Sequence, residues 1–419
     1  MSPPQFVYNV AVRVKELQSG RGMWLFWAGL LLCTLYQSYR YPLQINSTGT
    51  SPTYSDTPPL LNAGKYILAL PLLLIGAVRG FGKSGSPRHW TIALTTVFLS
   101  SYALLKLFGD AQPNYIDLAF WMLFPLVLVW AVDAVTIPAI DRFLRYLLVY
   151  AFGSTLVQVV LFLAIGRLPA LAFEGTHLIR FGGFLDDPNG FAAVLFLLMG
   201  WSYKRFRGKA RFCIVAGIVV CLLLTQSWTG VAFLLLATSV SGLVALSKKP
   251  VLAMATLCTA TLISAFVVST ISRSHYEIAQ EVLTEKEDSI EGHLFPLEKV
   301  ADSWREWALE GNTTYATHES WWAGALVNFG APWYCAWFGL IVALIISLQR
   351  GVTEAVSEAK PVYSGFFLFG AYFAFGSITL PYPIIFPANF FFFLFSFLVA
   401  FGKVRLENGL PSLRSRTVA

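Results

Sequence analysis

Charge is scarce in this chain, because only 13% of its 419 residues are charged and 56% are hydrophobic. An ordinary soluble domain carries about a quarter of its residues as charged ones. So large an apolar excess cannot be buried in one soluble core and needs lipid as its solvent. The composition therefore argues against a soluble globular protein and predicts an all-α, polytopic membrane protein.

Cysteine is also rare, and the motifs of soluble enzymes are missing. The five cysteines lie in apolar runs without a CxxC pair, which argues against a disulfide framework and a zinc site. The sequence contains no Walker loop, no HExxH and no GxSxG. A cleavable signal peptide is not expected, since the first apolar run lacks a clear cleavage site and is interpreted as a retained first helix.

Long apolar runs are what the chain has instead. A membrane-spanning helix needs about 20 mostly apolar residues, and this criterion predicts about twelve spans. The run at 190–203 is short and needs its flanks to reach across, whereas Gly330 and Pro332 predict a broken or kinked helix in the run after His318. The predicted spans are 22–40, 63–79, 89–108, 115–136, 143–166, 190–203, 211–226, 228–246, 251–271, 321–348, 362–380 and 384–402.

The distribution of Lys and Arg predicts the orientation. With both chain ends in the cytoplasm, 21 of the 30 Lys and Arg residues fall in cytoplasmic segments and 8 in external ones, as the positive-inside rule requires. This pattern also accounts for the net charge of +7 without nucleic acid as a partner. The chain is expected to be a single transmembrane domain, 1–419, with one long external loop at 272–320.

Three external stretches are polar: 41–62, 167–190 and the loop 272–320. The third contains one readable helix, which begins near Pro296 and repeats apolar residues at steps of three and four up to Trp304 and Trp307. We expect it to be a short amphipathic helix on the outer membrane surface.

Arg180 is the first polar residue that can carry chemistry, since it lies among apolar neighbours just before a span. It can be an interfacial arginine that snorkels or pairs with Asp186 or Asp187, or it can clamp an anion, because a guanidinium binds phosphate through two hydrogen bonds. Asp186 and Asp187 can suggest a metal, but a turn or a cap fits adjacent carboxylates better. Asp187 or Asn189 can cap the next helix.

Further candidates lie in and after the long loop. Arg305 can form an ordinary surface pair with Asp302 or can act beside Trp304 on a substrate, and Arg273 begins the loop where a snorkelling anchor is the simpler account. His318 lies where the loop re-enters the membrane. Loop arginines nearby would favour its neutral form, which a general base requires.

Four segments together resemble the O-antigen ligase and O-antigen polymerase superfamily. The first runs from Arg180-Phe181-Gly182-Gly183-Phe184 through Asp187-Pro188-Asn189 to Ala192, and the second is Leu224-Thr225-Gln226-Ser227-Trp228-Thr229-Gly230. The third is Ser303-Trp304-Arg305-Glu306-Trp307, and the fourth is His318 followed by Leu326 and Gly330. The resemblance covers about residues 150–350. Trp228 and Glu319 depart from the family, which commonly has Arg and Asn there.

The resemblance implies a GT-C-like fold with a helical periplasmic cap in the bacterial inner membrane. It implies an inverting, metal-independent glycosyltransferase without a cofactor. Its donor would be a glycan on polyprenyl pyrophosphate, and its acceptor a sugar hydroxyl, either of lipid A-core (ligase) or of a growing glycan (polymerase). It implies catalytic roles for His318, Arg180 and Arg305, and substrate binding by a second group that comprises Arg273, Asp187, Asn189, Glu319 and Trp304.

A transporter or flippase of lipid-linked glycans is the alternative. Twelve spans with both ends inside are compatible with it. Against it, the chain shows no two similar halves and few ionisable residues at mid-span, Asp133 being the main exception.

Overall fold

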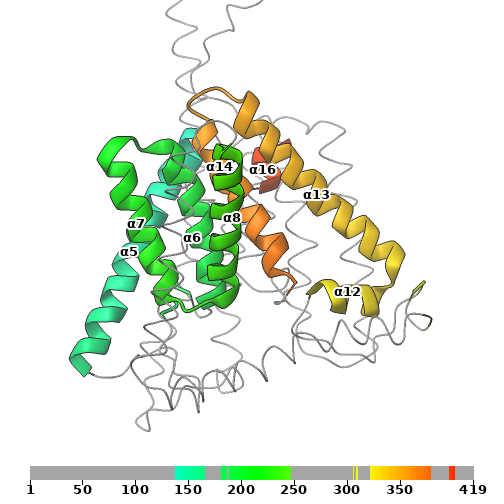
Figure 1. Ribbon diagram of the computed structural model, residues 1–419, viewed down its shortest axis with the longest axis horizontal. Coiled ribbons are helices and arrows are strands. Elements are labelled where there is room, and N and C mark those ends of the chain that lie inside the picture. The colour runs from blue at the N-terminus through cyan, green and yellow to red at the C-terminus, as the bar shows by residue number, and fades with distance from the viewer. Residues whose placement is uncertain are drawn as a thin grey trace, which may run out of the picture.

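The computed structural model describes residues 137–165, 181–185, 188–246, 305, 308–309, 321–378 and 396–401 (Figure 1). All regular elements in these ranges are helices, as the composition predicted. They are α5 (Ile137–Ile165), α6 (Pro188–Arg205), α7 (Gly208–Leu224), α8 (Trp228–Leu246), α12 (Trp321–Phe329), α13 (Ala331–Glu354), α14 (Lys360–Gly376) and α16 (Ser396–Phe401).

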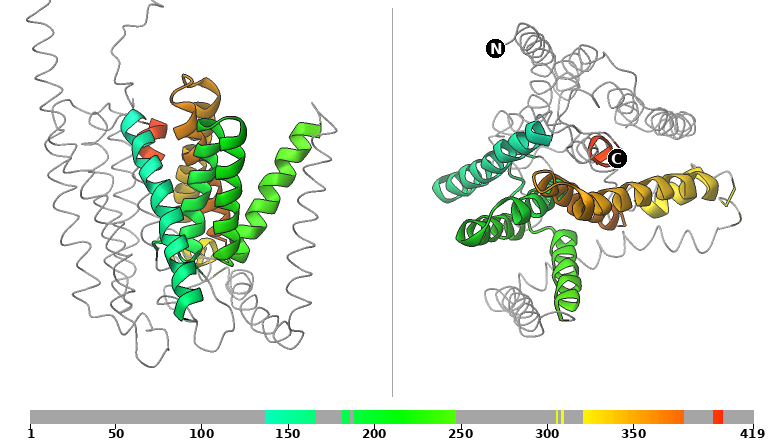
Figure 2. Two further views of the ribbon diagram at one scale, coloured as in Figure 1. Left: turned by 90° about the vertical axis from the view of Figure 1, so that its left-hand side faces the viewer. Right: turned by 90° about the horizontal axis from the view of Figure 1, so that it is seen from above.

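The long helices lie side by side and run alternately up and down, so the bundle has two ends (Figures 1 and 2). We call one the Gln226 end: there α5, α7 and α14 finish, and α6, α8, α12 and α13 begin. We call the opposite one the Arg207 end, after the two-residue loop 206–207 that joins α6 to α7. Short connections force neighbouring helices to be antiparallel, and this places residues far apart in sequence at the same end.

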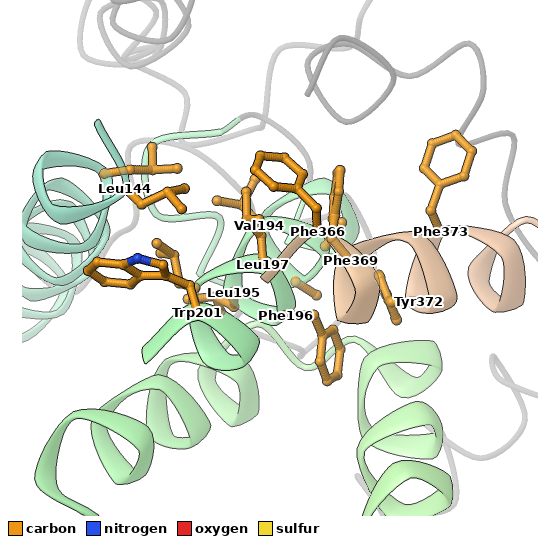
Figure 3. Close-up of a cluster of buried hydrophobic side chains, with 14 of the residues drawn as sticks. Leu144, Val194, Leu195, Phe196, Leu197, Trp201, Phe366, Phe369, Tyr372 and Phe373 are labelled. Atoms are coloured by element: carbon orange, nitrogen blue, oxygen red, sulfur yellow. The ribbon is translucent and has the colours of Figure 1, made fainter. Parts of the chain in front are cut away.

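Helix α6 is the centre of the core. From Phe191 to Leu198 all of its side chains are 0% exposed, because helices surround it. Figure 3 shows its phenylalanine and leucine side chains meeting aromatic residues of α14. The ring of Phe196 lies 4.5 Å from that of Tyr372 and 4.9 Å from that of Phe233, between centroids. A helix that is apolar all round is stable only when it is buried on every side.

Two glycines allow α6 and α14 to approach closely. A Cβ atom added to Gly200 would lie 2.5 Å from the carbonyl oxygen of Ser364, and one added to Gly365 would lie 2.9 Å from that of Leu197. Small residues at a crossing let two helix backbones come together, which is typical of helix contacts in membranes.

Two helices in the described ranges are long and apolar enough to cross a membrane: Ile137–Ala164, with 28 residues, and Ala331–Glu354, with 24. At about 1.5 Å per residue both exceed the roughly 30 Å of a bilayer core. On α5 the large apolar side chains of Val149, Leu156 and Leu163 are more than 60% exposed. A helix face of this kind matches a lipid solvent better than water.

The run after His318 is a broken helix, as its glycine and proline predicted. Helix α12 ends at Phe329, Gly330 has a φ of 82°, and α13 begins at Ala331 with Pro332 in its first turn. A positive φ is accessible to glycine at no steric cost, and a proline in the first turn gives up a donor that has no helical partner anyway. The break turns the chain between α12 and α13.

Helix α6 corresponds to the short predicted span 190–203 and is longer than that span. It begins at Pro188 and ends at Arg205, so its flanks do extend it. The predicted spans 143–166, 211–226, 228–246 and 362–380 correspond to α5, α7, α8 and α14 within a few residues. The five predicted spans at 22–40, 63–79, 89–108, 115–136 and 251–271 lie outside the described residues, as does most of 384–402 and of the loop 272–320.

Candidate functional site

The segment that follows Arg180 is anchored at the Gln226 end by a side chain of α5. The Nε2 atom of Gln158 donates to the carbonyl oxygen of Gly183 at 2.8 Å, and the N–H of Gly183 donates to Oε1 of Gln158 at 2.9 Å. One carboxamide therefore satisfies both backbone groups of a buried glycine. The paired hydrogen bonds fix the course of residues 181–185.

Glycine is required at position 183 on two counts. Its φ is 60°, in the left-handed region, and a Cβ atom would lie 2.3 Å from the ring of Phe191. That ring also packs edge-on against Phe184, at 5.3 Å between centroids. The aromatic side chains therefore close over the backbone of this turn and bury it.

The same segment touches the turn between α7 and α8. The N–H of Phe181 donates to the carbonyl oxygen of Leu224 at 3.1 Å. The turn is short, as predicted, and occupies 225–227. Ser227 is the last residue of the turn, directly before α8. Its hydroxyl accepts from the N–H of Gly230, in the first turn of α8, at 3.2 Å. Two segments of the family resemblance are thus direct neighbours, although Phe181 and Leu224 are 43 positions apart in sequence.

Helix α14 connects this turn to α12. The ring of Phe375 lies 5.5 Å from that of Phe233 in α8, between centroids. On the other side, Trp322 donates its backbone N–H to the carbonyl oxygen of Ser377 at 3.3 Å, and its indole Nε1–H to that of Ala374 at 2.9 Å. The first turn of α12, which starts three residues after His318, is therefore fixed to the end of α14.

The segment that follows Arg305 reaches the same end. The N–H of Ala331 donates to the carbonyl oxygen of Ala308 at 3.0 Å, so residues 308–309 lie against the break between α12 and α13. Arg305 itself is helical and exposed. Hydrogen bonds and ring contacts thus link the neighbourhoods of all four segments of the resemblance in one continuous series at the Gln226 end.

Aromatic rings line the region where α12 meets α13. Trp333 packs on Trp321 of α12, at 6.4 Å between centroids, and stacks on Trp337 at 5.6 Å. A second row pairs Trp322 with Tyr334 at 5.7 Å and with Phe338 at 5.2 Å. Flat aromatic faces beside polar groups suit amphipathic ligands such as sugars and lipid headgroups.

Two buried polar atoms at this end lack a hydrogen-bond partner within the protein. They are Oε1 of Gln226 and the indole Nε1 of Trp321. Gln226 also has a φ of 48°, which is uncommon for a residue other than glycine. Buried polar groups are nearly always paired, so these two atoms stand out, although the hydroxyl of Ser202, near the Arg207 end, is unpaired as well.

Of the predicted site residues, the described part of the chain contains Asn189 and Arg305. Asn189 is the second residue of α6 and half-buried. It lies inside the helix, so it does not occupy the cap position before Pro188. Six predicted site residues lie outside the described residues: His318, Arg180, Arg273, Asp187, Glu319 and Trp304.

The sequence reasoning missed Gln158 and Trp321 as site residues, and it named Gln226 only as part of the segment 224–230. Gln158 had a usable signal, since a carboxamide in the middle of an apolar span is costly and calls for a partner. Its partner, Gly183, follows 25 residues later, and no periodicity connects the two.

The chain matches no protein-family model, no curated protein and no solved structure. Its fold and site are therefore described from its own residues.

Proposed function

We propose that this chain is a polytopic membrane glycosyltransferase of about twelve transmembrane helices. It moves a glycan from polyprenyl pyrophosphate to a sugar hydroxyl, as an O-antigen ligase or a polysaccharide polymerase does. The proposal places it in the bacterial inner membrane, with both chain ends in the cytoplasm and the Gln226 end facing the periplasm. Two helices long and apolar enough to cross a membrane support the membrane location alone.

One observation carries the proposal: the neighbourhoods of four sequence segments that resemble this superfamily meet at one end of the bundle. Phe181 is bonded to Leu224, and Ala308 to Ala331. Trp322 is bonded to the end of α14. These segments are spread over about 150 residues of sequence, and the packing of the bundle brings their neighbourhoods to the same end.

The chemistry suits the residue types of the four segments. The acceptor oxygen attacks the anomeric carbon, the bond from that carbon to the phosphate oxygen breaks, and its electron pair leaves with the polyprenyl pyrophosphate. Arg180 and Arg305 neutralise the charge that develops on the leaving group. His318 takes the hydroxyl proton as general base. A single displacement of this kind inverts the anomeric centre.

The described residues add a binding surface to this chemistry. Sugar hydroxyls both donate and accept hydrogen bonds, so they can satisfy Oε1 of Gln226 and Nε1 of Trp321. The half-buried rings of Trp322 and Tyr334 and the exposed ring of Phe338 provide faces for the apolar sides of a sugar ring or for the first prenyl units. A lipid-linked glycan has both kinds of surface in one molecule.

The test is a transfer reaction with the purified protein in detergent. It receives a polyprenyl-pyrophosphate glycan, with and without lipid A-core and with and without EDTA. Glycan joined to the core identifies a ligase, and a longer glycan on the prenyl carrier identifies a polymerase. Activity in EDTA supports the arginine mechanism. Full product yield from both His318→Ala and Arg180→Ala at normal protein levels would refute the assignment of roles.

The same purified protein can be used to distinguish a glycosyltransferase from a transporter. A flippase moves its lipid between leaflets of a sealed vesicle and forms no new glycosidic bond. Movement of a labelled lipid-linked glycan across proteoliposomes, with no transfer in detergent under any of these conditions, would favour the transporter.

A further inference from the structure

Positive charge gathers at one corner of the Arg207 end, where α5 begins and α6 passes into α7. In these three helices and their loop, Asp141 is the one carboxylate among the described residues. The same helix ends and the loop carry seven basic residues: Arg142, Arg145, Lys204, Arg205, Arg207, Lys209 and Arg211.

Asp141 neutralises only two of these cations. Its carboxylate accepts from Arg145 Nη2 at 2.7 Å and pairs with Arg205 Nε at 3.1 Å. It also accepts from the indole Nε1 of Trp201 at 2.9 Å, which anchors it to the core. Four exposed cations therefore face outward without a carboxylate from these helices: Arg142, Lys204, Arg207 and Lys209.

The corner has a fixed frame. The N–H of Phe206 donates to the carbonyl oxygen of Ser202 at 3.0 Å, and its ring packs edge-on against Trp201 at 5.6 Å. The Nε–H of Arg211 donates to the carbonyl oxygen of Phe206 at 2.9 Å. These contacts hold the backbone of the loop, from which Arg207 and its neighbours Lys204 and Lys209 extend.

Apolar side chains lie beside these cations. Tyr203 is 52% exposed and Phe212 is 76% exposed. The ring of Tyr203 has Lys204 Nζ at 5.8 Å and Arg211 Cζ at 5.1 Å from its centroid. Exposed aromatic rings next to Lys and Arg at a helix end are typical of the depth where lipid headgroups meet the acyl chains.

A second corner at the same end shows that this charge is not a general property of the end. Where α13 passes into α14, Arg350 and Lys360 are balanced by Glu354 and Glu358. Orientation by the positive-inside rule needs basic residues only, and it gives no reason for the surplus to concentrate on α5, α6 and α7.

We propose that the corner formed by Arg142, Lys204, Arg207 and Lys209 binds the headgroup of an anionic phospholipid of the phosphatidylglycerol class. The cations bind the phosphate, and Tyr203 and Phe212 lie against the glycerol and the upper acyl chains. The exposed rings favour a lipid over a free phosphate, because a soluble anion gains nothing from them. The inference rests on the proposed membrane location but not on glycosyl transfer.

The experiment is native mass spectrometry of the full chain, released from micelles that contain phosphatidylglycerol and phosphatidylcholine with the same acyl chains. Wild-type protein should retain phosphatidylglycerol preferentially. Two matched variants each remove one Arg and one Lys: Arg207→Gln/Lys209→Gln at the corner and Arg350→Gln/Lys360→Gln at α13–α14. Each basic residue near an anionic lipid contributes about 1 kcal/mol, or roughly fivefold, so the corner variant should bind phosphatidylglycerol roughly 25-fold more weakly. The control should bind as the wild type does.

Several results would overturn the proposal. Equal retention of the two lipids by the wild type would do so, as would an equal loss in the control variant. Displacement of the lipid by an equal concentration of glycerol phosphate would identify a soluble anion as the ligand instead. If the corner variant does not fold, Arg207→Lys/Lys209→Arg replaces it and must keep the preference. Recovery of the chain from cells in the aqueous fraction without detergent would remove the membrane on which the proposal rests.

Discussion

Gln158 allows the sharpest test of how the Gln226 end is built. Its carboxamide bonds to both backbone groups of Gly183, at 2.8 and 2.9 Å, and Gly183 is buried. Gln158→Met keeps nearly the same volume and removes both hydrogen bonds. The perturbation therefore separates hydrogen bonding from packing.

The magnitude follows from the two groups left unpaired. A buried backbone N–H or C=O without a partner costs about 1–3 kcal/mol. Gln158 is only half-buried, so we take the lower part of that range and expect a total loss of about 2–4 kcal/mol in the free energy of unfolding. The control is Val157→Ala on the same helix, whose side chain is 56% exposed, and it should change stability by less than about 0.5 kcal/mol.

The assay is reversible unfolding of both variants in mixed micelles, monitored by circular dichroism. The glycosyl transfer reaction is then run without denaturant, at a temperature at which both variants are folded. Because Gly183 follows Arg180 by three residues, release of the turn should also lower kcat by about 10- to 100-fold, as small displacements of catalytic groups do. A Gln158→Met protein as stable and as active as the Val157→Ala control would refute this account of the turn.

Three other changes test separate parts of the structure. Gly365→Leu should prevent assembly of α6 and α14, since even a Cβ atom would lie 2.9 Å from the carbonyl oxygen of Leu197, and a monodisperse, normally stable protein in size-exclusion chromatography would contradict this. Asp141→Ala leaves the buried indole N–H of Trp201 unpaired and frees two arginines. It should lower the free energy of unfolding by about 1–3 kcal/mol, and an unchanged unfolding midpoint would count against the corner described here. Gln226→Gly removes a left-handed non-glycine residue and its unpaired amide, so it should raise KM by about tenfold without loss of stability; an unchanged KM would mean that Gln226 does not bind substrate.

The sequence predicted the helices of the described region well, because each depends on local pattern. Apolar runs located α5, α7, α8 and α14, and the pair Gly330 and Pro332 located the break between α12 and α13. Glycine with positive φ and proline in a first turn act through backbone geometry within a few residues, so the helix break can be predicted from the local sequence.

The contacts between helices could not be predicted from local sequence patterns. Gln158 meets Gly183 across 25 residues, and Trp201 meets Asp141 across 60. Each is a tertiary contact, fixed by how the helices pack rather than by periodicity along one of them. The order of the motifs indicated that they share a site, but only the packing of α14 between α8 and α12 connects the turn at 225–227 with the start of α12.

The catalytic residues and the described part of the chain are known in different ways. Catalytic roles for His318 and Arg180 come from the resemblance and from the chemistry of glycosyl transfer, and both residues lie outside the described ranges. The described residues supply the arrangement of their neighbours. The central claim is therefore one of location: the pyrophosphate of a lipid-linked glycan binds at the Gln226 end.

Photo-crosslinking tests that claim most directly. A polyprenyl-pyrophosphate glycan with a diazirine on the first prenyl unit is bound to the purified protein in detergent, and the complex is irradiated. Peptide mass spectrometry then locates the labelled positions on the protein. Unlabelled donor serves as competitor. We predict labels, lost on competition, in the peptides that contain Phe181–Leu185, the 225–227 turn and Trp321–Trp333. Labels confined to the Arg207 end, or labelling that the unlabelled donor does not reduce, would contradict the account.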